Sequence, residues 1–531
     1  MRRIKQQKIW LVGLIVVMLL FVTACNGNST PPADGSGNAP TPATPEQTQD
    51  SGPQAGGILK ITVTGEGAAP MGVPWENTTN DTLYMVPMVE SLVKEQSDGT
   101  IEPYLAESWK VDMDAKEVVF KLRQGVKFTD GSDFNAEAAA FNLEYCIEAG
   151  QLQGATGVEA RGDYELAITF DVFMNQMIGR LAAKTCGFIS KESFEANGIE
   201  WARENPVATG PYMQKEYVRG EKFELVKNDN YWDAPKPYVD GITFLFIRDV
   251  MTQQAAMQST GDQSIDVLLT TSGEQAKALT DLGLEAEKLA IGPLALIPSS
   301  KDASSPLANP DVRKAIAWAI DRDSIMAARG FGILSPAYQM ISEDWPAHLP
   351  DSENIGYDVA KAKQFLADAG YPDGFKTKII AMPGFADRDA MVILQSQLAE
   401  IGIEVELEFP DSGGYNNYRS TGWDGLLAQH FRVQSNVNNM WNVYIPPEEV
   451  SLVSMKRTPE LLEAIVASSS TPEVDAAASQ NVIRVMTDEM TMIPIYNIYD
   501  IYITKPTVHD GEFGKWGGST CWLSQNVWLE Q

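Results

Sequence analysis

Histidine and cysteine are scarce in this chain, and their scarcity excludes several classes of site. The 531 residues include three histidines and four cysteines. The chain has neither the HExxH spacing of a zinc helix nor the GxSxG turn of a serine hydrolase, and no two cysteines have CxxC spacing. The sequence therefore predicts no metal site, no cofactor and no catalytic residues, so the protein is not expected to be an enzyme.

Positive charge is also in short supply. The chain has 41 lysines and arginines against 71 aspartates and glutamates, which gives a formal net charge of −30. Such a surface repels phosphate groups, so nucleic acid is not an expected partner. With so many carboxylates, spacing alone identifies no glycosidase pair. An extracellular carboxylate-dependent glycosidase therefore stays open as an alternative to a binding protein.

One hydrophobic run stands at the N-terminus. Residues 9–22 are apolar, follow a basic start and end in Val22-Thr-Ala-Cys25. The run is shorter than the roughly 20 residues of a membrane-spanning helix, and its pattern is that of a secretory signal peptide over residues 1–24. The ending resembles a bacterial lipobox, which implies a diacylglyceryl group on Cys25. The alternative is an ordinary signal peptide in which Cys25 is incidental.

The segment after the signal peptide is polar and rich in Ser, Thr, Pro and Gly over residues 25–55. Such a composition buries too little apolar surface to fold, so we predict a disordered tether. Lipid and tether together would hold the folded body at the outer face of the cytoplasmic membrane, on its extracellular or periplasmic side.

The cysteines of the body allow one disulfide at most. After Cys25 only Cys146, Cys186 and Cys521 remain. Cys146 and Cys186 are the candidate pair, and buried free thiols are an equally good interpretation.

The body, residues 56–531, alternates strand-like and helix-like segments, which indicates an α/β fold with more than one lobe. No linker divides it, so the lobes are expected to be interwoven. A strand–helix–strand unit over residues 376–382, 387–401 and 403–409 predicts a parallel pair of strands. Other predicted elements are strands at 58–63 and 118–122 and helices that begin at Asn135, Asn309 and Asp358.

Several blocks of the body form a recognisable set. They are PYLAESW (103–109) with FKLRQGVKF (120–128), NPVATGPY (205–212) with NDNYW (228–232), DVRKAIAWAIDR (311–322), YDVAKAK through AGYP (357–372) and IPIY (493–496). Together they resemble the solute-binding proteins of oligopeptide ABC importers, a class that also includes dipeptide-, nickel- and some oligosaccharide-binding members. The blocks keep their order from about Gly57 to the C-terminus, so the resemblance covers nearly the whole body.

The resemblance implies a two-lobed periplasmic-binding-protein fold with a hinge and an extra inserted domain. Carried onto this chain, lobe one takes residues 56–93, 206–290 and 496–531, the insert takes 94–205, and lobe two takes 291–495. It also implies a monomeric receptor that closes over a small organic ligand, a peptide or an oligosaccharide, and delivers it to an ABC permease and ATPase complex.

The resemblance further implies where the ligand cleft lies. In the oligopeptide members the cleft is walled by the loop before the first helix, by the residues after the Pro-x-Tyr turn and by the segment after a Trp-Asp strand. The corresponding ligand-binding candidates here are Trp75, Asn77, Tyr496, Asn497, Trp423, His430 and Arg432.

One departure from the family pattern concerns the ligand. Peptide-binding members place an aspartate in the third wall to pair with the ligand's α-amino group, and this chain has Val433 near that point, with no acidic residue between Gly425 and Tyr444. A buried ammonium needs a carboxylate partner. We therefore predict that a free peptide N-terminus is not held in the usual way, and that Arg432 or His430 favours a carboxylate, phosphate or hydroxyl-rich ligand. An oligosaccharide binder, and less so a nickel-chelate carrier, remain alternatives.

Overall fold

The computed structural model describes residues 52–65, 71–77, 82–343, 345–384, 386–432, 441, 444–446, 449–516 and 522–531. The predicted signal peptide 1–24, Cys25 and the tether up to Ser51 lie outside these ranges, as does Val433. The chain divides into two units, Met1–Ser51 and Gly52–Gln531, and the described residues belong to the second.

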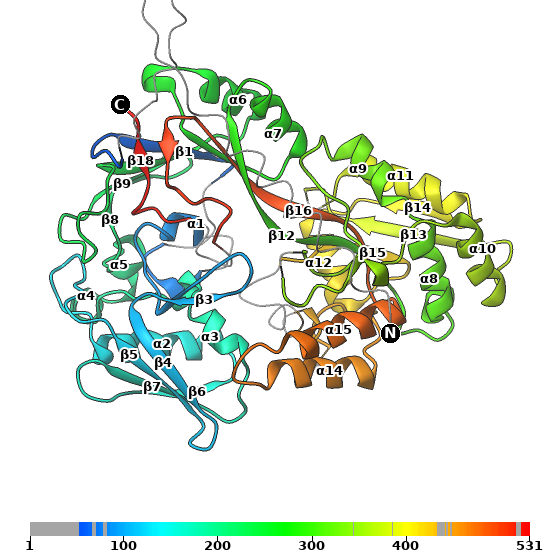
Figure 1. The fold of residues 1–531 in the computed structure, drawn as a ribbon, viewed down its shortest axis with the longest axis horizontal. Coiled ribbons are helices and arrows are strands. Elements are labelled where there is room, and N and C mark those ends of the chain that lie inside the picture. Colours follow the sequence, from blue (N-terminus) through cyan, green and yellow to red (C-terminus); the bar gives the residue numbers. More distant parts are fainter. Residues whose placement is uncertain are drawn as a thin grey trace, which may run out of the picture. The chain divides into compact units, whose positions relative to one another are not determined.

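A ten-stranded mixed sheet runs through the body (Figure 1). Its strand order is β14-β13-β15-β12-β16-β11-β1-β10-β9-β8. The strands are β1 (Ile58–Val63), β8 (Tyr212–Val218), β9 (Lys222–Lys227), β10 (Gly241–Phe246), β11 (Val267–Thr270), β12 (Glu285–Pro298), β13 (Lys376–Ala381), β14 (Glu404–Glu408), β15 (Leu426–His430) and β16 (Ile493–Thr504). Because the sheet draws its strands from distant parts of the sequence, its two ends cannot be separated by cutting one linker.

Two long antiparallel strands, β12 and β16, connect the ends of this sheet. They pair from Glu285 opposite Thr504 to Leu296 opposite Ile493, with register shifts on the way. On one side β12 pairs with β15, and on the other β16 pairs with β11. The predicted crossings between lobes, at residues 290/291 and 495/496, fall inside these two strands, and the division into lobes stays a prediction.

Helices pack with the strands of the β13–β15 end of the sheet around two buried cores. Asn309 and Asp358 accept backbone N–H bonds as N-caps, and Asp387 does so at the next helix. The buried faces include Val312, Leu366 and Leu394. These helices are α8 (Pro310–Ala319), α9 (Arg322–Arg329), α10 (Val359–Asp368), α11 (Arg388–Ala399), α12 (Ser412–Thr421), α14 (Pro459–Ser469) and α15 (Ala476–Glu489).

A separate four-stranded sheet with its own apolar core lies between β1 and β8 in the sequence. Its strand order is β4-β5-β7-β6, and it packs against the helix α2 (Ala136–Glu148). The strands are β4 (Ala106–Asp112), β5 (Glu117–Leu122), β6 (Ala155–Ala160) and β7 (Glu165–Phe170), and short neighbouring elements are β2 (Val93–Glu95), β3 (Ile101–Pro103), α3 (Gln176–Arg180), α4 (Lys191–Asn197) and α5 (Ile199–Glu204).

The remaining elements of the described residues are short. They are α1 (Thr82–Met85), α6 (Val250–Gln258), α7 (Gly273–Thr280), β17 (Val508–His509), β18 (Trp528–Leu529) and the single turns η1 (Pro74–Glu76), η3 (Lys184–Cys186), η4 (Gly261–Gln263), η5 (Pro306–Ala308) and η6 (Asp351–Glu353). Among the helices of the described residues, none has both the length and the apolar character needed to cross a membrane.

The sequence predictions of individual elements are confirmed. The strand–helix–strand unit corresponds to β13, α11 and β14, and β13 pairs with β14 in parallel. The predicted strands at 58–63 and 118–122 are β1 and part of β5. Asn135 caps α2 through its side chain.

Candidate functional site

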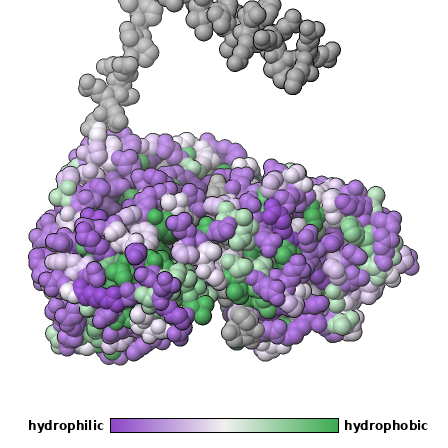
Figure 2. All heavy atoms as spheres, turned by 60° about the horizontal axis from the view of Figure 1, so that its bottom comes forward, coloured by the Kyte–Doolittle hydropathy of each residue, from purple (hydrophilic) through white to green (hydrophobic). Residues whose placement is uncertain are grey.

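A cavity with a volume of about 670 Å³ lies against β15 and β16. It is lined by the start of α7, by residues of α9 and the loop after it, by the start of α11 and by Arg419 of α12. This volume is within the range of small-molecule sites. On the face drawn in Figure 2 the surface is hollowed near its middle, and hydrophobic residues gather along that hollow.

The cavity wall is partly apolar. Ile291 and Ile498 come from the central strands, and Met326 and Leu334 come from α9 and the loop after it. Tyr496 lies among them, and its hydroxyl accepts a hydrogen bond from the backbone N–H of Asp387 at 3.2 Å. Burial raises the pKa of Tyr496 to about 12, so the phenol stays protonated at neutral pH. These residues give the cavity an apolar contact area beside its polar and charged lining.

Two of the arginines at the cavity are held in ion pairs. Arg329 lies 2.8 Å from Asp387 and 3.4 Å from Asp389. Arg432 makes two hydrogen bonds of 3.1 Å to the two carboxylate oxygens of Asp500, which lies on β16. Paired guanidinium groups of this kind are already neutralised within the protein.

His430 adds no charge to the cavity. Burial, and then the neighbouring charge of Arg432, lower the pKa of its imidazole to about 3. The ring is therefore neutral at physiological pH and acts through hydrogen bonding alone. Any positive potential that favours an anionic ligand has to come from another residue.

Arg419 is the third arginine in the lining of this cavity. It lies in the last turn of α12 and lines the cavity, and its Nη2 donates to the hydroxyl of Ser451 at 3.0 Å. Its Nε is buried and has no hydrogen-bond acceptor among the described residues. Within the described part of the chain no carboxylate lies within ion-pair distance of it.

Three of the seven ligand-binding candidates line this cavity, namely His430, Arg432 and Tyr496. The other four lie elsewhere in the described structure. Asn497 borders a second cavity of about 620 Å³ and donates to Ser335 and Pro336. Because side chains alternate along a strand, Tyr496 and Asn497 of β16 point to opposite faces. Trp423 is buried and donates from its indole to the carbonyl of Ile297 at 3.2 Å.

Trp75 lies within η1, and Asn77 caps its C-terminal end. The indole of Trp75 stacks on Tyr145 of α2, with ring centroids 4.7 Å apart. The side chain of Asn77 donates to the carbonyl of Val73 at 2.8 Å. Whether Trp75, Asn77, Trp423 or Asn497 contacts a ligand stays a prediction.

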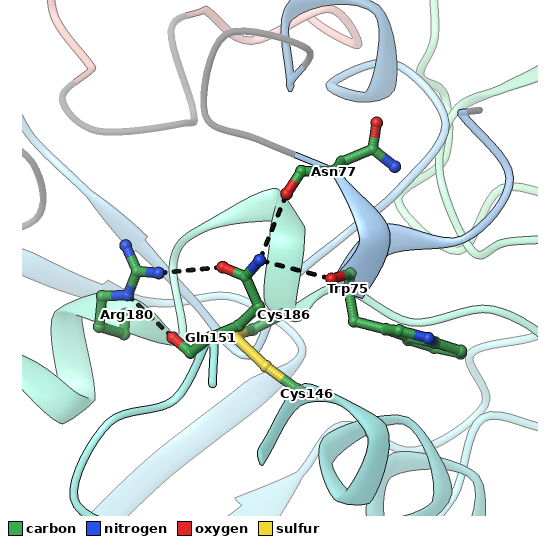
Figure 3. Close-up of a disulfide and its surroundings, with 6 residues drawn as sticks. All are labelled: Trp75, Asn77, Cys146, Gln151, Arg180 and Cys186. Carbon is green, nitrogen blue, oxygen red and sulfur yellow. Dashed lines mark hydrogen bonds between the residues drawn. A yellow bond between two sulfur atoms is a disulfide. The ribbon is translucent and has the colours of Figure 1, made fainter. Parts of the chain in front are cut away.

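A hydrogen-bonded network holds this loop in place beside a disulfide (Figure 3). The side chain of Gln151 donates to the carbonyls of Trp75 and Asn77, at 3.4 and 3.3 Å. Arg180 in turn donates to both the backbone and the side-chain oxygen of Gln151. Cys146 and Cys186 are joined in the structure, with Cα atoms 5.7 Å apart, a usual separation for a disulfide.

Several cavity residues carry no signal in the sequence. Arg329, Arg419 and Glu274 belong to no motif, and they meet only because α9, α12 and α7 end or begin at the same cavity. The described residues contain no group of three or more His, Cys, Asp or Glu side chains arranged to hold a metal ion.

Comparison with known proteins identifies the family of this chain. The model of the bacterial extracellular solute-binding proteins, family 5 Middle, matches residues 100–446. The chain belongs to this family. Members are solute-binding proteins of ABC importers and are not enzymes.

Curated relatives are similar over part of their length. The glutathione-binding protein GsiB of Salmonella typhi is 29% identical over 348 residues, which are 63% of this chain and 66% of that protein. GsiB of Pectobacterium atrosepticum is 30% identical over 335 residues, 58% of this chain and 61% of that protein. The matched segments thus span less than two thirds of these relatives.

Solved structures show the fold. The periplasmic binding protein DppA of Helicobacter pylori, in complex with the peptide STSA, has a TM-score of 0.74 at 21% identity over 90% of this chain and 99% of that one. The substrate-binding protein CtaP of Listeria monocytogenes has a TM-score of 0.78 at 20% identity over 90% of this chain and 100% of that one. The chain therefore has the two-lobed fold of periplasmic binding proteins.

Proposed function

We propose that this family 5 protein is a lipid-anchored receptor that captures a peptide-class ligand in the 670 Å³ cavity and delivers it to an ABC permease and ATPase complex. The observation that carries the proposal is the cavity itself. It combines an apolar wall around Tyr496 with polar and charged side chains, which is the composition of a site for a small polar organic molecule.

The relatives favour a peptide-class ligand. Two of the similar proteins are named as glutathione-binding, and one solved neighbour holds a tetrapeptide. Glutathione and peptides share amide groups and at least one carboxylate. The apolar wall of the cavity suits the apolar side chains of a ligand that carries these amide and carboxylate groups.

The proposed lobes follow the predicted division, with lobe one at 56–93, 206–290 and 496–531, an insert at 94–205 and lobe two at 291–495. The paired strands β12 and β16 then form the connection between lobes. The cavity draws residues from both proposed lobes, for example Glu274 and Arg419. Hinge closure over the ligand would bring these residues toward it from two sides.

Ligand binding without turnover is the first expected result. The purified body, residues 52–531, is expected to rise in melting temperature with glutathione or with di- to pentapeptides, because a ligand that binds the folded state alone stabilises it. Calorimetry with the same panel measures the affinity, and chromatography of the recovered ligands checks for cleavage. Oligosaccharides and nickel chelates serve as controls. Stabilisation by oligosaccharides alone, or hydrolysis of any ligand, would contradict the proposal.

The anchor is tested separately through Cys25. In a bacterial host, the full chain is expected to fractionate with membranes and to label with radioactive palmitate, whereas Cys25→Ser is expected to appear in the soluble extracytoplasmic fraction without label. Two acyl chains on one cysteine hold a protein firmly, while a cleaved or unlipidated chain has nothing to hold it. Cys521→Ser is the matched control and should fractionate like the unmodified chain. Release of both variants alike would refute lipidation at Cys25.

A further inference from the structure

The charges around the cavity are distributed unevenly among its arginines. Arg329 faces Asp387 and Asp389, and Glu274 adds a third negative charge that acts on it. Arg432 is matched by Asp500. Arg419 has no carboxylate partner among the described residues, so its positive charge is the one at this cavity that the described protein leaves without a counter-charge.

The side chain of Arg419 does not have the surroundings of an ordinary solvent-exposed arginine. Its side chain is partly buried, and its Nε lies out of contact with water and without an acceptor. Its Nη2 donates only to a neutral group, the hydroxyl of Ser451. Leaving a buried donor unsatisfied costs free energy, and more so for a charged group. Because Nε is closed off from the cavity, a ligand can reach only the Nη atoms of this guanidinium.

A helix-dipole role accounts for only part of the arrangement. Arg419 lies in the last turn of α12, where a positive charge is favourable. A solvent-exposed arginine would satisfy that interaction without lining a cavity. The guanidinium instead shares the cavity wall with Gln429 and Tyr444, two side chains with hydrogen-bonding groups of their own.

We propose that Arg419 is the anion-binding residue of the cavity and that the ligand presents a carboxylate to it. The fork of the guanidinium suits a planar carboxylate, which can accept two hydrogen bonds at once. The inference rests on the proposed function, because it names the chemical end of the ligand that this site recognises. It also separates Arg419 from Arg432, whose guanidinium is occupied by Asp500.

The experiment compares ligands that differ only in this end. Calorimetry measures binding of the peptide STSA and of the dipeptide Met-Leu, each as the free acid and as the C-terminal amide. Removing a charged hydrogen-bonded pair is expected to weaken binding by about 10- to 100-fold. The unmodified protein should therefore prefer the free acids by that factor. Arg419→Met should bind acid and amide alike at the level of the amide, and Arg419→Lys should keep part of the preference.

A matched arginine outside the cavity controls for general effects. Arg484 of α15 pairs with Glu353, at 3.0 Å, and its side chain is 42% exposed. Arg484→Met should leave both affinities unchanged. The comparison of acid with amide in the unmodified protein needs no variant, so it stands even where Arg419→Met folds poorly.

The remaining outcomes separate the two proposals. Equal affinity for acid and amide in the unmodified protein, or undiminished binding of the acid by Arg419→Met, overturns the role of Arg419 while the receptor function stands. Binding of neither the acid nor the amide contradicts the peptide class of the proposed function, and the inference about Arg419 falls with it.

Discussion

Replacing Trp75 by alanine is expected to lower the free energy of unfolding by about 3–5 kcal/mol. The indole is 6% exposed and contacts three aromatic rings, stacking on Tyr145 and meeting Phe141 and Phe194 at wider angles. Its removal leaves a void that these rings cannot fill without shifting, because they also pack on one another. The cost is the lost transfer free energy together with the cavity that remains.

Because of the position of Trp75, its replacement should also weaken the packing of the loop around it. The indole connects η1, which precedes α1, to the helix α2, and Gln151 adds hydrogen bonds to the same loop. The variant is therefore expected to loosen the junction between this loop and the separate sheet as well as its aromatic core. Chemical denaturation measures the stability, and hydrogen exchange of residues 71–77 reports the loop.

Two controls define the mechanism at Trp75. Trp75→Phe keeps most of the ring contacts and should lose clearly less stability than the alanine variant. Trp201→Ala, at a side chain that is 36% exposed on α5, should change stability by about 0.5 kcal/mol or less. An alanine variant as stable as the unmodified protein would show that the stacked rings are not a packed unit. A large loss of ligand affinity at full stability would instead favour the predicted ligand role of Trp75.

The elements that could be predicted from sequence are those with local signals. Asn309 and Asp358 each accept a backbone N–H within three residues, so the start of α8 and of α10 follows from a few neighbouring positions. The parallel pairing of β13 with β14 follows from a strand–helix–strand order. By contrast, the central pairing of β12 with β16 joins segments far apart in the chain, and no local sequence pattern predicts its register.

The candidate site was partly predictable, but from the family resemblance. Tyr496, His430 and Arg432 belong to segments that the family resemblance places at the cleft, and they line the cavity. The charge state of these residues depends on residues that are distant in the sequence and become neighbours only in the fold. Arg432 meets Asp500 across strands, and His430 is neutral because it is buried beside that arginine. Arg419 carries no motif at all, and it matters only through its surroundings in the fold.

The ion pair between Arg432 and Asp500 leads to the second large expected effect. Asp500→Ala should lower stability by about 2–4 kcal/mol, since it leaves a partly buried guanidinium without this counter-charge. The carboxylate is 11% and the arginine side chain 27% exposed, so solvent relieves part of the cost of a fully buried pair. Chemical denaturation at neutral pH measures the loss.

A double variant separates the loss of the pair from the cost of the unpaired arginine. Arg432→Met combined with Asp500→Leu removes both charges and should be more stable than Asp500→Ala, because apolar groups of similar size often replace a buried pair without loss. Variants of Asp500 also test ligand binding. If Asp500 keeps Arg432 from binding anions, Asp500→Asn should strengthen binding of free-acid peptides while Arg419 is intact, because a second guanidinium then becomes available. Unchanged affinity in Asp500→Asn, together with unchanged stability in Asp500→Ala, would show that the pair neither supports the fold nor withholds Arg432 from the ligand.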